Sequence, residues 1–378
     1  MTAVEEGTEA PGHRTEPREH RTPWIDIVAA WVVARVVVGL GFGAAQGIAT
    51  QLPGTEFLHL DQGLLTWDAS WYASLAEHGY AGSPHEGLRF FPLYHLLAQA
   101  ISFGTFTDAA LLVISNGCAL VVLWLLHRLV VEQFGDERLA RRSVWLMALF
   151  PAAGAFVFAY SESLMLALTL GMYLLARRDR WWWVALLGVA TGLCRPVALL
   201  LCLPFAVLAW ESWRRSGWGD RLARLAGVAG PAVGVAAYLA WVQAVHGSWR
   251  IPIDLQRDIR KGVQDPFTRL WDAARHVLTD SQLDAPALGF AVLFIVLTVW
   301  SVRRQPVAWW LYSALTVVVA VSAPVIDSTG RYGLVAFPLV VALAQLARSE
   351  RSTWAALALS SAGLLGLTTM TLLGGYIP

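Results

Sequence analysis

Long apolar runs, separated by short polar segments, fill the sequence after residue 23 and constrain its fold more than any other feature. Hydrophobic residues make up 56% of the 378-residue chain and charged residues only 15%, whereas roughly 25% of the residues of an average soluble domain are charged. A soluble protein of this length needs more charge to cover its surface. The sequence therefore predicts an all-α, polytopic integral membrane protein whose surface is covered mostly by lipid.

The apolar runs predict about 11 transmembrane helices within a single domain over residues 24–378. They lie near residues 24–45, 108–131, 143–160, 163–176, 181–194, 197–210, 224–245, 286–302, 306–323, 333–347 and 353–373. Each is close to the ~20 residues that a bilayer requires, or somewhat shorter. The stretch at 90–103 is only 14 residues long and indicates an interfacial or re-entrant piece. Polar residues 1–23 are expected to form a disordered cytoplasmic tail.

The distribution of basic residues predicts the orientation in the cell membrane. With the N-terminus in the cytoplasm, 18 of the 28 lysine and arginine residues lie in inner segments and eight in outer segments, as the positive-inside rule requires. The loops near 132–142, 177–181 and 211–223 are then cytoplasmic. The two long loops, near 46–107 and 246–285, are extracytoplasmic, which places the expected chemistry outside.

Several other classes of protein or site find little support in the sequence. The net charge of +1 gives no sign of nucleic-acid binding. The three cysteines lie in apolar runs and indicate buried thiols rather than disulfides or a metal site. No glycine loop of the phosphate-binding kind is present, and neither a metal nor another cofactor is expected. Gly39, Gly43 and Gly47 recur every four residues in the first apolar run, which predicts close helix packing, with dimerisation as the alternative.

The densest group of polar and aromatic residues lies in the first outer loop, over residues 67–80. On a helix, Trp67, Trp71 and Leu75 form one stripe, and Asp68 and Tyr72 form the neighbouring stripe. This pattern predicts an amphipathic helix on the membrane surface, with its aromatic side chains among the lipid headgroups. Asp68 is a candidate catalytic acid, and the alternative is a helix cap or a solvated carboxylate.

Three further charges interrupt apolar runs, namely Glu162, Arg195 and Arg331. A charge at membrane depth is costly unless it is paired or hydrated, so each is a functional candidate. In the predicted topology all three lie on the same outer side as Asp68, which indicates one site. The alternative is that Glu162 and Arg195 only pair with each other to close two helical hairpins. Arg35 lies near the middle of the first apolar run, where it could pair with a carboxylate or bind a lipid phosphate.

Several motifs, in this order, resemble the PIG-V-like mannosyltransferases, which are relatives of GPI mannosyltransferase 2 with the GT-C membrane fold. The motifs are Trp67-Asp68 with Trp71-Tyr72, Phe90-Phe91-Pro92, Tyr160-Ser161-Glu162-Ser163, Arg195 and Arg331-Tyr332. The resemblance covers residues from about 24 to 350. The sequence departs from the family pattern after Arg195, where Pro196, Val197 and Ala198 replace an expected glycine, and at His95, which replaces a proline.

The resemblance implies a GT-C-like glycosyltransferase with a long first extracytoplasmic loop, which uses a polyprenyl-phosphate-linked mannose donor and a lipid or protein acceptor. It places the catalytic acid at Asp68 and substrate contacts at Trp67, Trp71, Tyr72, Glu162, Arg195 and Arg331. The residues suit this chemistry by themselves, since a carboxylate can take the proton of the acceptor hydroxyl and arginine can hold the leaving phosphate. A lipid or polyprenyl-phosphate transporter, with Arg35, Arg195 and Arg331 along a headgroup path, and a non-catalytic scaffold are the alternatives.

Overall fold

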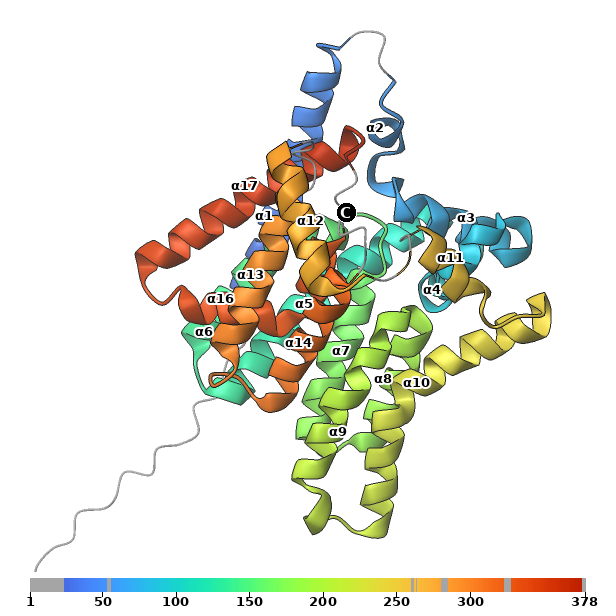
Figure 1. The fold of residues 1–378 in the computed structure, drawn as a ribbon, viewed down its shortest axis with the longest axis vertical. Helices are drawn as coiled ribbons and strands as arrows, with labels where there is room; N and C mark the ends of the chain where they lie inside the picture. The colour runs from blue at the N-terminus through green and yellow to red at the C-terminus, as the bar shows by residue number, and fades with distance from the viewer. Residues whose placement is uncertain are drawn as a thin grey trace, which may run out of the picture.

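The computed structural model describes residues 24–52, 56–259, 262, 264–279, 285–322 and 328–375. Throughout this described part the chain forms α-helices and short 3-10 helices without a strand (Figure 1). The all-α class is therefore confirmed. The α-helices are α1 (Trp24–Ala49), α2 (Leu58–Gln62), α3 (Asp68–Gly82), α4 (Leu93–Ile101), α5 (Thr107–Phe134), α6 (Glu137–Ala148), α7 (Glu162–Arg177), α8 (Trp181–Cys194), α9 (Cys202–Glu211), α10 (Trp218–His246), α11 (Ile251–Ile259), α12 (Pro266–Thr279), α13 (Ala285–Ser301), α14 (Val307–Val321), α15 (Thr329–Val335), α16 (Phe337–Leu346) and α17 (Glu350–Leu372). The 3-10 helices are η1 (Gly63–Leu65), η2 (His85–Arg89), η3 (Ala153–Phe156), η4 (Pro196–Leu201) and η5 (Trp213–Arg215).

The described helices are those of a multi-pass membrane protein. Four of them, α1, α5, α10 and α17, are long and apolar enough to cross a bilayer. The pair α15 and α16, bent by 82°, makes five if it counts as one broken span. The other apolar helices, including α8, α13 and α14, have between 10 and 17 residues, which is shorter than the ~20 residues of a full span. The predicted count of about 11 transmembrane helices is therefore not confirmed.

The segment before the YSES motif differs from the prediction. Helices α5 and α7 run in the same direction, since Ser115 lies beside Ser163 near one end and Glu132 binds Arg178 at the other. The chain must therefore return between them, and it does so through α6 followed by an irregular stretch with a single 3-10 helix, η3. The predicted helix over 143–160 is wrong, because Pro151 has no backbone N–H to donate and disfavours a helical residue before it.

Glycine packing in α1 also differs from the prediction. A side chain at Gly39, Gly43 or Gly47 would have no neighbour within 4 Å, whereas a Cβ at Gly41 would lie 2.9 Å from the Cβ of Thr368 in α17. The Oγ1 of Thr369 donates to the carbonyl of Gly41 at 3.1 Å. Within this chain, the close contact of α1 therefore uses Gly41 and not the predicted stripe. The stripe lies on the outer face of α1, where the dimerisation alternative stays untested.

Helices α8 and α10 pack with almost no space between their backbones. A Cβ at Gly192 would lie 2.2 Å from the carbonyl oxygen of Pro231, and one at Gly234 would lie 2.1 Å from that of Val189. Only glycine permits this approach. The contact fixes the C-terminal end of α8, where Arg195 follows directly.

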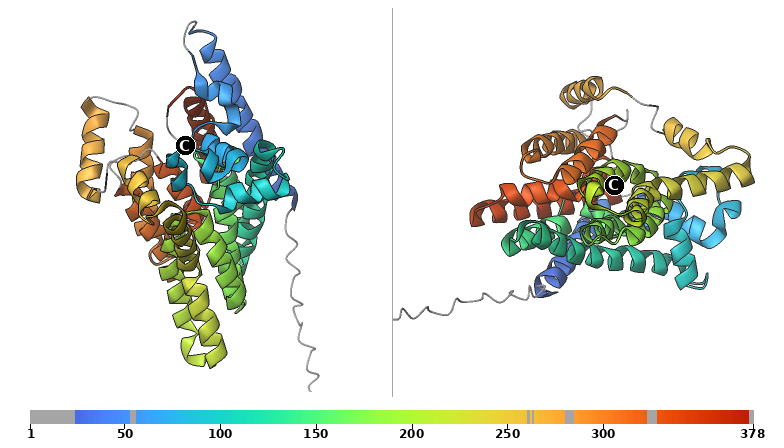
Figure 2. Two further views of the ribbon diagram at one scale, coloured as in Figure 1. Left: turned by 90° about the vertical axis from the view of Figure 1, so that its right-hand side faces the viewer. Right: turned by 90° about the horizontal axis from the view of Figure 1, so that it is seen from below.

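The polar outer loop folds over one end of the helices. It contains α2, η1, α3, η2 and α4 and lies in the upper part of Figure 1, whereas the turn between α9 and α10 lies at the bottom. The side view in Figure 2 agrees with this separation. Ion pairs and hydrogen bonds from Arg178 to Glu132 and from Arg224 to Asp179 join the predicted cytoplasmic segments to one another.

Candidate active site

Four charged side chains that are far apart in the sequence meet at one place. Nη1 of Arg331 donates to Oδ2 of Asp68 at 2.8 Å and to Oε1 of Glu162 at 3.2 Å. Nη1 of Arg195 lies 2.5 Å from the same Oε1 of Glu162. The Asp68, Glu162, Arg195 and Arg331 side chains therefore form one network, hereafter the acid–arginine cluster. The alternative in which Glu162 and Arg195 pair only with each other does not describe it, because Arg331 joins Glu162 to Asp68.

Asp68 is placed by an unusual backbone turn. The residue before it, Trp67, has φ +58° and ψ −125°, a conformation that glycine normally provides at this position of a type II′ turn. The amide of Ala69 donates to the carbonyl of Thr66 at 3.2 Å and closes the turn. Strain of this kind concentrates at functional sites. Asp68 begins α3 and is not its cap, so the cap interpretation of this carboxylate is wrong.

Glu162 lies at the start of α7 and is buried, with 1% of its surface exposed. The helix N-terminus favours its negative charge. Its second oxygen, Oε2, is buried without a hydrogen-bond partner among the described residues. A buried carboxylate oxygen without a donor is rare in folded proteins.

Arg35 holds the irregular stretch that leads to Glu162. Its guanidinium donates to Oδ1 of Asn116 at 3.0 Å, to the carbonyl of Phe156 at 3.0 Å and to that of Trp31 at 3.2 Å. The Nδ2 of Asn116 donates in turn to the carbonyl of Val157 at 3.1 Å. These bonds satisfy backbone carbonyls that a helix would have satisfied internally. Among the described residues, Arg35 therefore binds an amide and backbone carbonyls and forms no ion pair with a carboxylate.

The two arginines of the cluster are held by hydroxyl and aromatic groups. Arg195 follows the last residue of α8 and donates to Oγ of Ser161 at 3.2 Å. Arg331 is buried in α15, donates to Oγ of Ser328 at 3.2 Å and lies 5.2 Å from the ring centre of Tyr160. These contacts fix each guanidinium independently of its acid partner.

Arg89 is a member of the site that the sequence analysis did not name. It ends η2, and its guanidinium lies over the rings of Phe90 and Trp71, at 4.6 and 5.5 Å. Its Nε is buried without a hydrogen-bond partner among the described residues. The signal available in the sequence was its position next to the Phe90-Phe91-Pro92 motif.

The charges set the protonation state of Asp68. Burial disfavours its charged form, but the neighbouring guanidiniums, that of Arg331 above all, lower the pKa of Asp68 below its ordinary value. Arg89 and Arg195 act in the same direction. Asp68 is therefore a carboxylate at neutral pH, although its side chain is only 17% exposed.

The aromatic residues of α3 face the protein more than the prediction required. Tyr72 is buried and its hydroxyl bonds Oγ of Ser161 at 2.8 Å. Trp67 stacks on His59 with ring centres 3.8 Å apart and donates from Nε1 to the carbonyl of Thr371 at 3.0 Å. Trp71 is half-buried against Phe90. The prediction of headgroup anchors is wrong for Trp67 and Tyr72, because their polar groups are bound within the protein.

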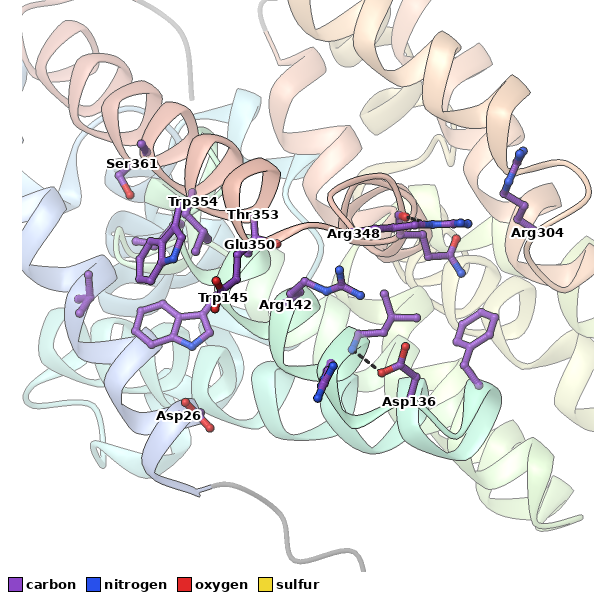
Figure 3. Close-up of a pocket in the computed structure, with 18 residues that line it drawn as sticks. Asp26, Asp136, Arg142, Trp145, Arg304, Arg348, Glu350, Thr353, Trp354 and Ser361 are labelled. Atoms are coloured by element: carbon purple, nitrogen blue, oxygen red, sulfur yellow. Dashed lines mark hydrogen bonds between the residues drawn. The ribbon is translucent and has the colours of Figure 1, made fainter.

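A small cavity, of about 20 Å³, lies between Tyr160, Thr368 and Thr371 and has room for about one water molecule. A much larger cavity, of about 1580 Å³, lies among α1, α6 and α17 (Figure 3) and is lined by none of the four residues of the acid–arginine cluster. No group of three or more His, Cys, Asp or Glu residues in the described part is placed to hold a metal ion.

No protein-family model matches the chain, and no curated protein sequence matches it. Among solved structures, it is similar to the oligosaccharyltransferase of Archaeoglobus fulgidus, crystallised in complex with Zn and sulfate. The two chains are 14% identical, the TM-score is 0.43, and the match covers 93% of this chain and 53% of that chain. The chain thus spans about half the length of this neighbour. A likeness of this size carries no functional assignment, and the predicted PIG-V-like family is not confirmed.

Proposed function

We propose that the protein is an integral membrane glycosyltransferase. It moves a hexose from a polyprenyl-phosphate-linked donor to a lipid or protein acceptor on the extracytoplasmic face of the membrane. The observation that carries this proposal is the acid–arginine cluster, in which Arg331 bonds both Asp68 and Glu162. The motif resemblance to PIG-V-like mannosyltransferases makes mannose the proposed sugar.

The charge of the site favours a phosphate ligand. Among the described residues, the guanidiniums of Arg89, Arg195 and Arg331 lie around the two carboxylates of Asp68 and Glu162. Arginine binds phosphate through two parallel hydrogen bonds. A donor phosphate bound by Arg195 and Arg331 would replace their carboxylate contacts, and both guanidiniums would stabilise the charge that grows on the leaving phosphate.

Asp68 is the proposed general base. Its side chain is 17% exposed, whereas that of Glu162 is 2% exposed. A phosphate that engages Arg331 weakens the ion pair of Asp68, and the carboxylate becomes more basic. Asp68 then takes the proton of the acceptor hydroxyl, whose oxygen bonds to the anomeric carbon of the sugar. The bond between that carbon and the phosphate oxygen breaks, and polyprenyl phosphate leaves.

The remaining residues of the site are proposed to bind substrate. The unpartnered Oε2 of Glu162 suits a sugar hydroxyl, which would supply the donor that the described residues lack. Trp67, Trp71 and Tyr72 are the aromatic residues at the start of α3, next to Asp68 or one helical turn from it in the chain. A sugar ring presents apolar C–H faces that such surface accommodates.

A transporter of lipid or polyprenyl phosphate is the alternative. Such a path would use Arg35 together with Arg195 and Arg331. The guanidinium of Arg35 already binds Asn116 and two backbone carbonyls and lies 4.2 Å from the ring centre of Trp31. An arginine committed to these contacts does not pass a headgroup along, so the observation favours the enzyme.

The test is a transfer assay with the full chain in proteoliposomes. Polyprenyl-phosphate-mannose is supplied together with lipid and peptide acceptors, and both mannosylated product and released polyprenyl phosphate are measured. The proposal predicts that the two products appear in equal amounts. Movement of the intact donor between leaflets, with neither product formed, would favour the transporter instead.

A further inference from the structure

A large cavity in the described part of the chain plays no part in the proposed transfer. It has a volume of about 1580 Å³ and lies between the start of α1, α6 and the first half of α17. Figure 3 shows that it has two parts: Trp145 and Trp354 lie together near Asp26, while Arg142 and Arg348 lie toward Asp136. We call this cavity the α6–α17 groove.

The basic part of the groove carries positive charge that no described acid neutralises. Arg138, Arg142, Arg304 and Arg348 line it, and none of the ion pairs in the described part of the chain includes them. Three of them are instead tied to backbone carbonyls: Arg142 to Ala347 at 2.7 Å, Arg348 to Gln345 at 3.1 Å and Arg304 to Trp300 at 2.7 Å. These bonds position the guanidiniums but do not neutralise them.

Three acids line the same groove together with these arginines. Asp136 caps α6 by accepting the amide of Leu139 at 2.9 Å, Asp26 lies 3.7 Å from Arg141, and Glu350 lies in the first turn of α17. The Nε of Arg142 is buried without a hydrogen-bond partner among the described residues. Since buried N–H groups are nearly always bonded, this donor points to a missing acceptor.

The other part of the groove is lined mostly by apolar residues. It runs along α17 from Glu350 to Ser361 and reaches Val33 in α1, and both helices are long and apolar enough to cross a membrane. The eleven helical steps from Glu350 to Ser361 correspond to about 16 Å, roughly half of the hydrocarbon thickness of a bilayer. Trp145 and Trp354 belong to this part, and tryptophan favours the interface between headgroups and acyl chains.

We infer that the α6–α17 groove binds an anionic phospholipid, with its phosphate among Arg142, Arg348 and their basic neighbours and its acyl chains along α17. A free phosphate ion would use the arginines but would leave the apolar part empty. The arginines belong to loops that the charge distribution assigns to the cytoplasm, and the cytoplasmic leaflet is rich in anionic lipid. The inference does not depend on the proposed transferase activity.

Lipid binding by the purified full chain tests the inference. Phosphatidylglycerol and phosphatidylcholine with identical acyl chains are titrated into the protein in detergent, and retained lipid is counted by native mass spectrometry. Wild type is expected to retain phosphatidylglycerol preferentially. Arg142→Gln and Arg348→Gln are each expected to weaken its binding about fivefold, since a basic residue near anionic lipid contributes ~1 kcal/mol.

A matched control and a second variant keep the test decisive. Arg351→Gln removes an exposed arginine of the first turn of α17, three residues after Arg348, that does not line the groove, and it is expected to retain lipid as wild type does. Arg142 also binds the carbonyl of Ala347, so Arg142→Gln could lower the melting temperature. In that case Arg348→Gln, at an exposed position, becomes the variant that tests lipid binding. An equal loss in all three variants, or no preference for phosphatidylglycerol, would overturn the inference. So would inorganic phosphate that binds as tightly as the lipid.

Discussion

At the residue scale, Asp68 and Glu162 have different tasks although Arg331 binds both. The side chain of Glu162 is 2% exposed and bonds two guanidiniums, whereas that of Asp68 is 17% exposed and bonds one. The ion pairs of Glu162 therefore stabilise the fold as well as the site, because a buried charge that loses its partner is strongly destabilising. Asp68 can be neutralised at a smaller cost in stability.

The first prediction follows from this difference. Glu162→Gln is expected to lower the free energy of unfolding by about 3–5 kcal/mol, since Arg195 and Arg331 both lose their shared buried carboxylate. Denaturant or thermal unfolding in detergent measures the change. Asp68→Asn, compared in the same experiment, should cost clearly less. Equal costs for the two variants would show that Asp68 has the same structural role.

The second prediction concerns pH. The pKa of Asp68 is lowered in the folded protein, so its ion pair contributes stability above the ordinary aspartate pKa of ~4 and loses it as pH falls through the lower folded pKa. The difference in melting temperature between wild type and Asp68→Asn should therefore stay constant between about pH 8 and 5. It should shrink only in more acidic buffer. A difference that changes between neutral pH and about pH 6 would indicate a raised pKa instead.

The sequence indicated the members of the site better than their surroundings. Asp68, Glu162, Arg195 and Arg331 were singled out as charges in or beside apolar runs, and the cost of isolated charge in a membrane was enough to predict that they meet. Arg89, Ser161 and Ser328 were missed, because a serine or an arginine in an outer loop carries no such cost. The burial of Arg331 was missed too, because the predicted span over 333–347 is two helices, α15 and α16, bent by 82°, and Arg331 lies within α15.

At the element scale, the position of Arg195 depends on how closely α8 approaches α10. The backbones touch at Gly192 and Gly234, and Arg195 lies three residues after Gly192. Any side chain at Gly192 must push the two helices apart and thereby move the guanidinium from Glu162. This glycine contact is where helix packing bears on the site.

The third prediction tests that link. Gly192→Ala is expected to destabilise the protein by about 1–3 kcal/mol through overpacking and to reduce transfer more than its loss of folded protein explains. Melting temperature and transfer rate per folded molecule are the measurements. Gly43→Ala on α1, where a Cβ would meet nothing within 4 Å, is the matched control and should leave both unchanged. An active, stable Gly192→Ala would mean that the helices separate without moving Arg195.

Helices were predictable only where one pattern ran long enough. The apolar runs that became α1, α5, α10 and α17 exceed the length of a span, and hydropathy identified them. The run at 143–160 is also apolar but contains Pro151 and ends in the irregular stretch that Arg35 and Asn116 bind. Hydropathy indicates that a segment is buried in an apolar environment, but it does not show that the segment is helical. In this stretch, hydrogen bonds from the side chains of Arg35 and Asn116 replace those of a helix.

At the scale of the whole molecule, the acid–arginine cluster and the α6–α17 groove are built from opposite sets of loops. The positive-inside rule places the loops near 132–142, 177–181 and 211–223 in the cytoplasm. Contacts such as Arg178 with Glu132 and Arg224 with Asp179 join these segments. The segments that are predicted to be cytoplasmic therefore lie at the same end of the helices. The orientation of that end in the membrane stays a prediction.

The fourth prediction tests that orientation. Glu86→Cys, at an exposed position in the first outer loop, should react with a membrane-impermeant maleimide in intact cells. Arg214→Cys, exposed between α9 and α10, should react only after the membrane is opened. Wild type, whose three cysteines are buried or half-buried, gives the background. The reverse pattern of labelling would place the acid–arginine cluster in the cytoplasm and contradict the proposed donor geometry.

The proposed role of Asp68 as the general base is tested by the rate of mannose transfer. This rate is measured for Asp68→Asn and for Asp61→Asn, each in proteoliposomes and normalised to folded protein. An asparagine in place of Asp68 keeps the shape of the side chain but cannot take a proton at neutral pH. Asp61 is an exposed acid of the same loop. The account predicts a loss of about 10²–10⁴-fold in Asp68→Asn and a wild-type rate in Asp61→Asn. Transfer by Asp68→Asn at the wild-type rate would contradict it.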